Sequence, residues 1–194
     1  MSSLLYIFLL FAAFISHSGA ATEPAVEAVK DIYGKPLLAG ISYYVLPVVR
    51  GGGGLTVILS ENTTCPRTVV QDQSEASHGI PVEFSPSVKS RTIPVSTDLN
   101  FQFSTFTIWN LDNVDETTNQ WFVSTCGEGG NPGRETVSNW FKIDKFEGNY
   151  KIRFCPSVCD VCRVMCRDIG VFVKDGKRRL ALSDVPLKVK FKKA

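Results

Sequence analysis

Close to its end the chain reads Leu187-Lys188-Val189-Lys190-Phe191-Lys192, an unbroken alternation of apolar and lysine side chains. A period of two residues predicts a β-strand with one face in a hydrophobic core and the other in water. Lysines on the outer face also discourage pairing with another sheet edge, so we interpret them as a solvated strand face and not as a nucleic-acid patch. A net charge of +2 adds no reason to expect nucleic acid or an acidic membrane as a partner.

Short runs of β-branched and aromatic residues recur along the chain, separated by turn residues such as Gly51–Gly54. No stretch combines a long 3.6-residue period with helix caps. The expected strands, twelve in all, are Tyr43–Val48, Leu55–Leu59, Thr68–Gln71, Pro81–Ser85, Leu99–Phe103, Thr107–Leu111, Trp121–Thr125, Trp140–Phe146, Tyr150–Cys155, Gly170–Lys174, Arg179–Ser183 and Leu187–Phe191.

The expected strands fall into three sets of four, whose first strands begin near Tyr43, Leu99 and Tyr150, at intervals of roughly 50 to 56 residues. A four-stranded unit present three times is typical of a closed, threefold all-β barrel. Closure removes sheet edges that would otherwise aggregate. The sequence therefore predicts an all-β protein with a single β-trefoil domain.

The first residues predict a signal peptide. Leu4–Phe14 is an apolar run too short to span a bilayer, and small residues from Ser18 to Ala21 follow it. We expect residues 1–21 to be removed and residues 22–194 to form a secreted domain in an oxidising compartment. Asn62-Thr63-Thr64 is a glycosylation acceptor motif that suits a surface loop of such a protein.

No catalytic constellation can be assembled from the sequence. Beyond the expected signal peptide the one histidine is His78, which lies in a polar turn and is interpreted as a solvated surface residue. A Gly-x-Ser-x-Gly elbow, a P-loop and a dinucleotide fingerprint are all absent from the sequence. We therefore expect a binding protein that is not an enzyme and that needs no cofactor.

Four of the six cysteines form the cluster Cys155-x3-Cys159-x2-Cys162-x3-Cys166. Thiolates at short spacings can hold zinc, but the secretory route oxidises thiols, so nested disulfides are the favoured interpretation. Bridges Cys155–Cys166 and Cys159–Cys162 would staple the connection between two strands. The outer bridge contributes about 3 kcal/mol in the chain-entropy model.

One polar segment stands out between two expected strands. It reads Pro86-Ser87-Val88-Lys89-Ser90-Arg91-Thr92-Ile93-Pro94, is bracketed by prolines and carries two long basic side chains at its centre. This is the composition of an ordinary surface loop. An extended loop that offers Lys or Arg to a trypsin-like pocket containing a buried carboxylate is the alternative interpretation.

Recognisable motifs are spread along the mature chain. They are Val29–Leu37 followed by Tyr43-Tyr44-Val45, Cys65-Pro66 with Val69–Gln71, Trp140–Ile143, Tyr150–Pro156, Asp168–Gly170 and Arg178–Ser183. Together they resemble the plant Kunitz, or soybean trypsin inhibitor-like, family. The run Phe154–Cys162 is most similar to the miraculin-like branch, and the resemblance implies a β-trefoil.

The resemblance also implies inhibition of serine proteases by substrate mimicry, through the loop between the fourth and fifth strands. An already extended loop loses little entropy on binding, and such interfaces bury about 1,600 Å² in total. Counted from Cys65, Lys89 falls before the scissile bond and Ser90 after it. A register with Arg91 before the scissile bond is the alternative. The expected protease-binding loop is Pro86, Ser87, Val88, Lys89, Ser90, Arg91 and Thr92.

Two departures from the family pattern bear on this expectation. Ala39 occupies the position where family inhibitors carry an Asn that supports the loop from behind, and its side chain cannot make those hydrogen bonds. The usual partner of the first cysteine lies in a stretch that this chain shortens, around Phe103–Ile108. The expected bridge is therefore Cys65–Cys126.

Other functions found in the family are the alternatives. They are non-inhibitory binding, as in taste-modifying, storage and chlorophyll-binding relatives, and inhibition of papain-like cysteine proteases through other loops. The main expectation is a secreted inhibitor of trypsin-like serine proteases that serves plant defence or the control of endogenous proteolysis. Its expected location is extracellular, in the apoplast or cell wall.

Overall fold

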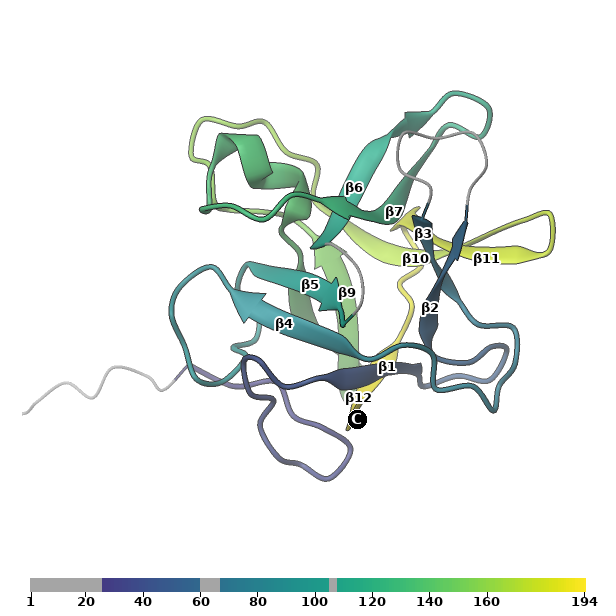
Figure 1. The fold of residues 1–194 in the computed structure, drawn as a ribbon, viewed down its shortest axis with the longest axis horizontal. Coiled ribbons are helices and arrows are strands. Elements are labelled where there is room, and N and C mark those ends of the chain that lie inside the picture. The colour runs from purple at the N-terminus through teal and green to yellow at the C-terminus, as the bar shows by residue number, and fades with distance from the viewer. Residues whose placement is uncertain (1–25, 60–66, 105–107) are drawn as a thin grey trace, which may run out of the picture.

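The computed structural model describes residues 26–59, 67–104 and 108–194, and strands dominate this part of the chain (Figure 1). Within it, the elements in chain order are β1 (Tyr43–Pro47), β2 (Leu55–Leu59), β3 (Arg67–Gln71), β4 (Val82–Pro86), β5 (Leu99–Phe103), β6 (Ile108–Asp115), β7 (Gln120–Gly127), the 3₁₀ helix η1 (Arg134–Asn139), β8 (Lys142–Phe146), β9 (Asn149–Phe154), β10 (Arg167–Lys174), β11 (Lys177–Ser183) and β12 (Val189–Lys193).

Half of the described strands close into a barrel. In this ring β1 pairs with β4, β4 with β5, β8 with β9, β9 with β12 and β12 with β1, all antiparallel. An isolated bridge closes the ring between β5 and β8. In it the amide of Leu99 donates to the carbonyl oxygen of Phe141 at 2.8 Å, and the amide of Phe141 donates back at 3.0 Å. Closure pairs strand edges that would otherwise be open to other chains.

The remaining strands form hairpins that join one another beside the barrel. The hairpins are β2–β3, β6–β7 and β10–β11. Their strands β3, β7 and β11 pair in a triangle. Along the chain each hairpin stands between two barrel strands, so the same four-stranded unit is repeated three times. The predicted β-trefoil is confirmed.

The expected strands differ from the observed ones mainly at their ends. β6 and β7 extend past their apolar runs, to Asp115 and Gly127, because backbone pairing across the hairpin continues through polar residues. The strand expected from Trp140 begins at Lys142, since helix η1 precedes it and Trp140 is buried at the end of that helix. Among the described residues, no helix is long and apolar enough to cross a membrane.

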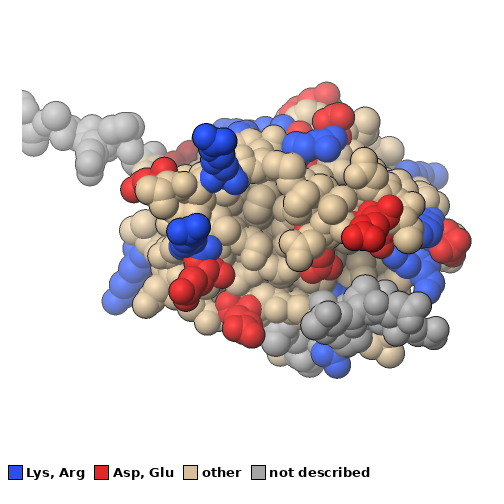
Figure 2. All heavy atoms as spheres, turned by 90° about the horizontal axis from the view of Figure 1, so that it is seen from above, with Lys and Arg blue, Asp and Glu red and all other residues tan. Residues whose placement is uncertain are grey.

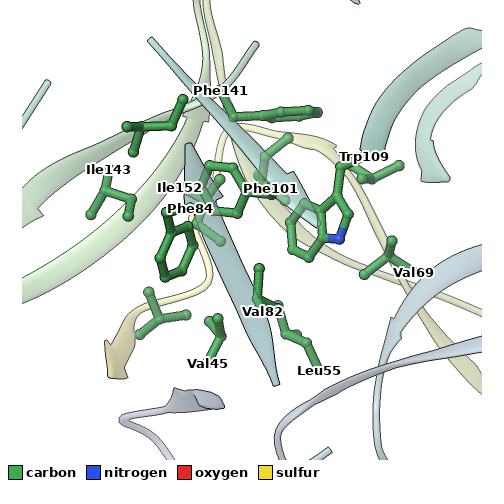
Figure 3. Close-up of a cluster of buried hydrophobic side chains, with 14 of the residues drawn as sticks. Val45, Leu55, Val69, Val82, Phe84, Phe101, Trp109, Phe141, Ile143 and Ile152 are labelled. Atoms are coloured by element: carbon green, nitrogen blue, oxygen red, sulfur yellow. The ribbon is translucent and has the colours of Figure 1, made fainter. Parts of the chain in front are cut away.

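Aromatic side chains from several barrel strands fill the core (Figure 3). Phe84 packs edge-on against Phe101 and Phe191, with 4.9 and 5.6 Å between ring centroids. Phe101 stacks on Trp109, also at 4.9 Å, and meets Phe141 edge-on. Each of these side chains is fully buried. The cluster therefore joins β4, β5, β6, β12 and the bridge residue that precedes β8.

Truncation of Phe101 tests the centre of this cluster. Phe101→Ala leaves a cavity among three aromatic neighbours, and we expect it to lower the free energy of unfolding by about 3–5 kcal/mol. Urea denaturation followed by circular dichroism measures the loss. Phe172→Ala is the control, because it removes a half-buried ring of β10 that meets Phe122 at 5.8 Å. Equal losses in the two variants would contradict a central role for Phe101.

A partly buried carboxylate lies on the β6–β7 hairpin. Asp112 accepts hydrogen bonds from the Ser124 hydroxyl at 2.6 Å and from the Asn110 side-chain amide at 3.0 Å. Burial raises the pKa of Asp112 above its ordinary value, and the two hydrogen bonds offset this effect in part. A folded-state pKa above the unfolded one means that ionisation is disfavoured in the fold. The contribution of Asp112 to stability is therefore largest at low pH and is lost as pH rises through the folded pKa.

Asp112→Asn keeps an acceptor oxygen for both donors and cannot ionise. At pH 7 we expect the variant to be at least as stable as the parent protein. Its advantage should shrink as pH falls toward 3.8, the ordinary pKa of an aspartate. Thermal denaturation of both proteins between pH 3 and pH 7 (about the range in which aspartates titrate) measures the difference. A variant that is less stable at pH 7 by an amount independent of pH would contradict this account.

Candidate functional site

The predicted protease-binding loop connects β4 to β5 and projects from the barrel at the left of Figure 1. Pro86 is the last residue of β4, so the unpaired part begins at Ser87. Val88 is 76 % exposed, and the side chains of Lys89 and Arg91 are exposed as well. Within the described residues no hydrogen bond or ion pair involves Val88 or Lys89. The tip of the loop is therefore open to a partner.

The C-terminal arm of the loop is held by the first described segment of the chain. Ile93 is fully buried, and its amide donates to the carbonyl oxygen of Leu37 at 2.9 Å. The carbonyl oxygen of Ile93 accepts the amide of Val29 at 2.8 Å. Further along, the amide of Val95 donates to the carbonyl oxygen of Glu27 at 2.8 Å. This arm is thus fixed by main-chain hydrogen bonds and one apolar anchor.

The backbone of Ala39 supports the tip of the loop from behind. Its amide donates to the carbonyl oxygen of Arg91 at 3.0 Å, next to a β-bridge between Leu38 and Thr92. Ser90 adds a brace inside the loop, since its hydroxyl donates to the Thr92 carbonyl oxygen at 2.7 Å. The side-chain support expected from an Asn is missing at Ala39, but main-chain support at the same position is present.

The N-terminal arm is held by the main chain of Asp98, whose carboxylate is fixed in turn by other polar side chains. The amide of Ser87 donates to the carbonyl oxygen of Asp98 at 2.9 Å. The carboxylate of Asp98 accepts the amide and the hydroxyl of Ser157 at 3.1 and 2.5 Å, and Lys142 Nζ lies 3.6 Å away. The sequence analysis did not identify Asp98 or Ser157. They are 59 residues apart, and each looks like an ordinary polar turn residue.

A second buried carboxylate holds the return of the loop toward β5. Asp144 of β8 accepts the hydroxyl of Ser96 at 2.7 Å and pairs with Arg153, whose Nη1 lies at 3.1 Å. Ser96 has a φ of 58°, in the left-handed region, and its amide donates to the carbonyl oxygen of Ile143. The sequence analysis missed this contact as well, for the same reason of distance along the chain.

The cysteine cluster is oxidised as predicted. Disulfides join Cys155 to Cys166 and Cys159 to Cys162 in the connection between β9 and β10. These bridges exclude a zinc site built from the four thiolates. The described residues contain no group of three or more His, Cys, Asp or Glu that could hold a metal ion.

Several predicted features fall on parts of the chain outside the described residues. They are the signal peptide at residues 1–21, the glycosylation site Asn62 and the first cysteine, Cys65. Cys126, the predicted partner of Cys65, is disulfide-bonded. The pairing of these two residues stays a prediction.

His78 lies on the surface, as the sequence predicts. It is exposed, its ring is 5.2 Å from the ring of Tyr44, and its Nε2 lies 3.5 Å from Lys192 Nζ. On the face shown in Figure 2, basic and acidic side chains are interspersed with uncharged ones. That face has no continuous patch of one sign of the kind that binds nucleic acid.

The sequence matches a known family along almost all of its length. The model of the family described as trypsin and protease inhibitor, of the legume Kunitz type, matches residues 29–193. Kunitz trypsin inhibitor 5 of Arabidopsis thaliana is 70% identical over 195 residues, which cover 100% of each chain. Miraculin of Synsepalum dulcificum is 44% identical, over 98% of this chain and 94% of its own.

A solved structure shares the fold. The Kunitz-type cysteine protease inhibitor PCPI-3 from potato superposes with a TM-score of 0.77 and is 34% identical, over 87% of this chain and 98% of its own. The family match includes the β4–β5 loop, the strands that flank it and the connection closed by the two disulfides. The chain therefore belongs to the Kunitz family of trypsin and protease inhibitors and is itself a β-trefoil protease inhibitor.

Proposed function

We propose that the protein inhibits trypsin-like serine proteases, with the β4–β5 loop as a substrate mimic and Lys89 as the residue that enters the specificity pocket. The observation that carries the proposal is an exposed lysine at the tip of a loop whose two arms are both fixed to the barrel. A lysine ammonium complements the carboxylate of a trypsin-like pocket. In this proposal the protein performs no catalysis, because the protease supplies every reacting side chain.

The hydrogen bonds of the loop favour Lys89–Ser90 over Arg91–Thr92 as the bond presented to the protease. A serine protease binds the carbonyl oxygen of the residue before the scissile bond in its oxyanion hole. The Arg91 carbonyl oxygen already accepts the amide of Ala39, and it would have to give up that hydrogen bond. The Lys89 carbonyl oxygen has no such partner within the described residues and is available to the protease.

The fixed arms favour inhibition over digestion. Ser87 is bonded to Asp98 on one side of the tip, and Arg91 is bonded to Ala39 on the other. Because both arms are already fixed, little conformational entropy is lost when the loop enters a protease cleft. If the bond is cleaved, the new ends stay close together at a high effective concentration, which favours their religation.

Truncation of Lys89 tests the proposal directly. Lys89→Ala should raise the inhibition constant against trypsin roughly 30- to 5,000-fold, the range for removing one partner of a buried charge pair. Arg91→Ala is the matched control, since it removes an exposed basic side chain from the same loop and keeps the main-chain bond to Ala39. It should change the constant far less. Circular dichroism should show the parent fold in both variants, because both side chains are exposed.

Lys89→Phe turns the same test into a gain of function. An aromatic side chain suits the hydrophobic pocket of chymotrypsin, so inhibition should pass from trypsin to chymotrypsin. Loss of trypsin inhibition in Arg91→Ala alone would show that the scissile bond is the one after Arg91. Unchanged trypsin inhibition in all three variants would contradict the proposal that this loop binds the protease.

Inhibition of papain-like proteases is the second candidate, because the potato protein that shares the fold is described as a cysteine protease inhibitor. The variants of Lys89 separate the two activities. Papain inhibition that survives Lys89→Ala would assign the second activity to another surface of the molecule.

We further propose that the protein is secreted and acts outside the cell. Oxidised cysteines support this proposal, since disulfides form and persist in oxidising compartments. Expressed in a eukaryotic secretory pathway, the mature chain should begin at Ala21 or Thr22 and carry a glycan at Asn62. N-terminal sequencing, and the mass before and after deglycosylation, check the two parts. A mature chain that still begins at Met1 would contradict secretion.

A further inference from the structure

We propose that Asp98 is a positioning residue of the β4–β5 loop, and that its contact with Ser157 decides whether the loop resists cleavage by a bound protease. This inference rests on the function proposed above for the loop. Asp98 stands at the base of the loop, directly before β5. It acts through Ser87, whose amide it binds, and not through a contact of its own with the protease.

Asp98 joins the loop to two other parts of the molecule. Its main-chain carbonyl oxygen accepts the amide of Ser87 at 2.9 Å. Its carboxylate accepts the amide of Ser157 at 3.1 Å and the hydroxyl of Ser157 at 2.5 Å. Lys142, at the start of β8, lies 3.6 Å from the same carboxylate and also donates to the Ser157 hydroxyl oxygen at 3.0 Å. One residue thus connects the loop with β8 and with the β9–β10 connection.

Burial makes this contact costly to break. The side chains of Asp98 and Lys142 are 7% and 15% exposed. Without the carboxylate, the amide of Ser157 and the ammonium of Lys142 would lose an acceptor in a site that water reaches poorly. The next residue, Leu99, is fixed by its two hydrogen bonds to Phe141. The main-chain carbonyl of Asp98, which accepts the Ser87 amide, is therefore fixed in two ways: by the contacts of the Asp98 carboxylate and by the hydrogen bonds of Leu99.

The position of Ser157 depends on the outer disulfide. Ser157 lies inside the connection that Cys155 and Cys166 close, two residues after Cys155. In Figure 1 this connection and the β4–β5 loop lie on the same side of the molecule. The disulfide therefore fixes the position of Ser157, and Ser157 in turn fixes Asp98 by donating to its carboxylate. Through this one contact the bridged connection acts on the protease-binding loop.

Cleavage is the event that such positioning controls. Hydrolysis of Lys89–Ser90 takes up one water molecule and leaves a carboxylate on Lys89 and an ammonium on Ser90. The Ser90 end stays in place through the bond between Arg91 and Ala39, whereas the Lys89 end depends on the bond between Ser87 and Asp98. If Asp98 is released, the Lys89 end moves away and religation loses its effective concentration. The loop is then a substrate, and cleaved protein accumulates.

The test compares cleavage of variants by trypsin. Asp98→Ala should accumulate protein cut at Lys89–Ser90 about 10 to 100 times faster than the parent, as expected for the loss of charge-assisted hydrogen bonds. Asp98→Asn keeps an acceptor for Ser157 and should restore most of the resistance. Mass spectrometry of timed samples measures the cut fraction. Ser157→Ala is a milder variant, because it removes the hydroxyl and keeps the main-chain amide, and it should give a smaller increase.

Asp168→Ala is the matched control for stability. Asp168 pairs with Lys151 at 2.9 Å, and both side chains are nearly as buried, at 18% and 19% exposed. This pair joins β9 to β10, and in the described part of the chain no hydrogen bond or ion pair links it to the loop. The variant should lose thermal stability and still be cut at the parent rate. Equal acceleration in Asp168→Ala and Asp98→Ala would overturn a specific role for Asp98.

Amide hydrogen exchange of the free protein separates this inference from the proposed function. In Asp98→Ala the Ser87 amide should exchange faster, while the Ile93 amide, on the other arm, keeps its rate. An unchanged Ser87 rate would overturn the positioning role even if the parent protein inhibits trypsin. A faster Ser87 rate in a protein whose parent form does not inhibit trypsin would uphold the positioning role and reject the function proposed for the loop.

Discussion

Two reciprocal hydrogen bonds between Leu99 and Phe141 close the barrel, and the geometry of the loop depends on that closure. Without this bridge the ring of antiparallel strands would open between β5 and β8 and expose two edges. Phe141 also packs against Phe101 in the aromatic core, so the same residue fixes the ring and fills it. Because Leu99 follows the loop directly, closing the barrel also fixes the point at which the loop returns to the sheet.

The two arms of the loop differ in what supports their main-chain hydrogen bonds. The C-terminal arm depends on main-chain hydrogen bonds and on the buried side chain of Ile93. Main-chain groups are present whatever the residue type, which explains how Ala39 can support the loop without the Asn side chain expected there. The N-terminal arm is also held by a main-chain bond, from the Ser87 amide to Asp98, but the residue that accepts this bond is itself fixed by particular side chains, those of Asp98 and Ser157. Sequence changes therefore act more strongly on the second arm than on the first.

Much of the fold could be predicted because β-structure leaves a local mark on the sequence. The alternation around Val189 and Phe191 reports which face of a strand is buried, and both residues are fully buried in the structure. The nested disulfides follow from spacing within one short segment. The polar supports of the loop leave no local mark, because Asp98 and Ser157 meet only once the barrel is formed.

The reason for the glycines at Gly53 and Gly54 could not be predicted from the sequence either. The run Gly51–Gly54 reads as a flexible turn, but Gly53 and Gly54 are buried against the segment that carries Ser74 and His78. A Cβ atom at Gly53 would overlap the carbonyl oxygen of Ser74, and one at Gly54 would overlap that of His78. Glycine is required there for close approach of two backbones. Sequence alone shows the residue type and not the neighbour that demands it.

The two ends of the described chain meet, and this has a consequence for when the β4–β5 loop gains its support. The amide of Ile32 donates to the carbonyl oxygen of Phe191 at 2.9 Å, and β1 pairs along its whole length with β12. The segment that backs the loop is therefore itself backed by β12, which is made long after the loop during synthesis. Contacts between such distant parts of a chain form late in folding. A growing or C-terminally shortened chain that lacks β12 carries the β4–β5 loop without this backing, and we expect proteases to cut such a loop more readily than the one in the complete barrel.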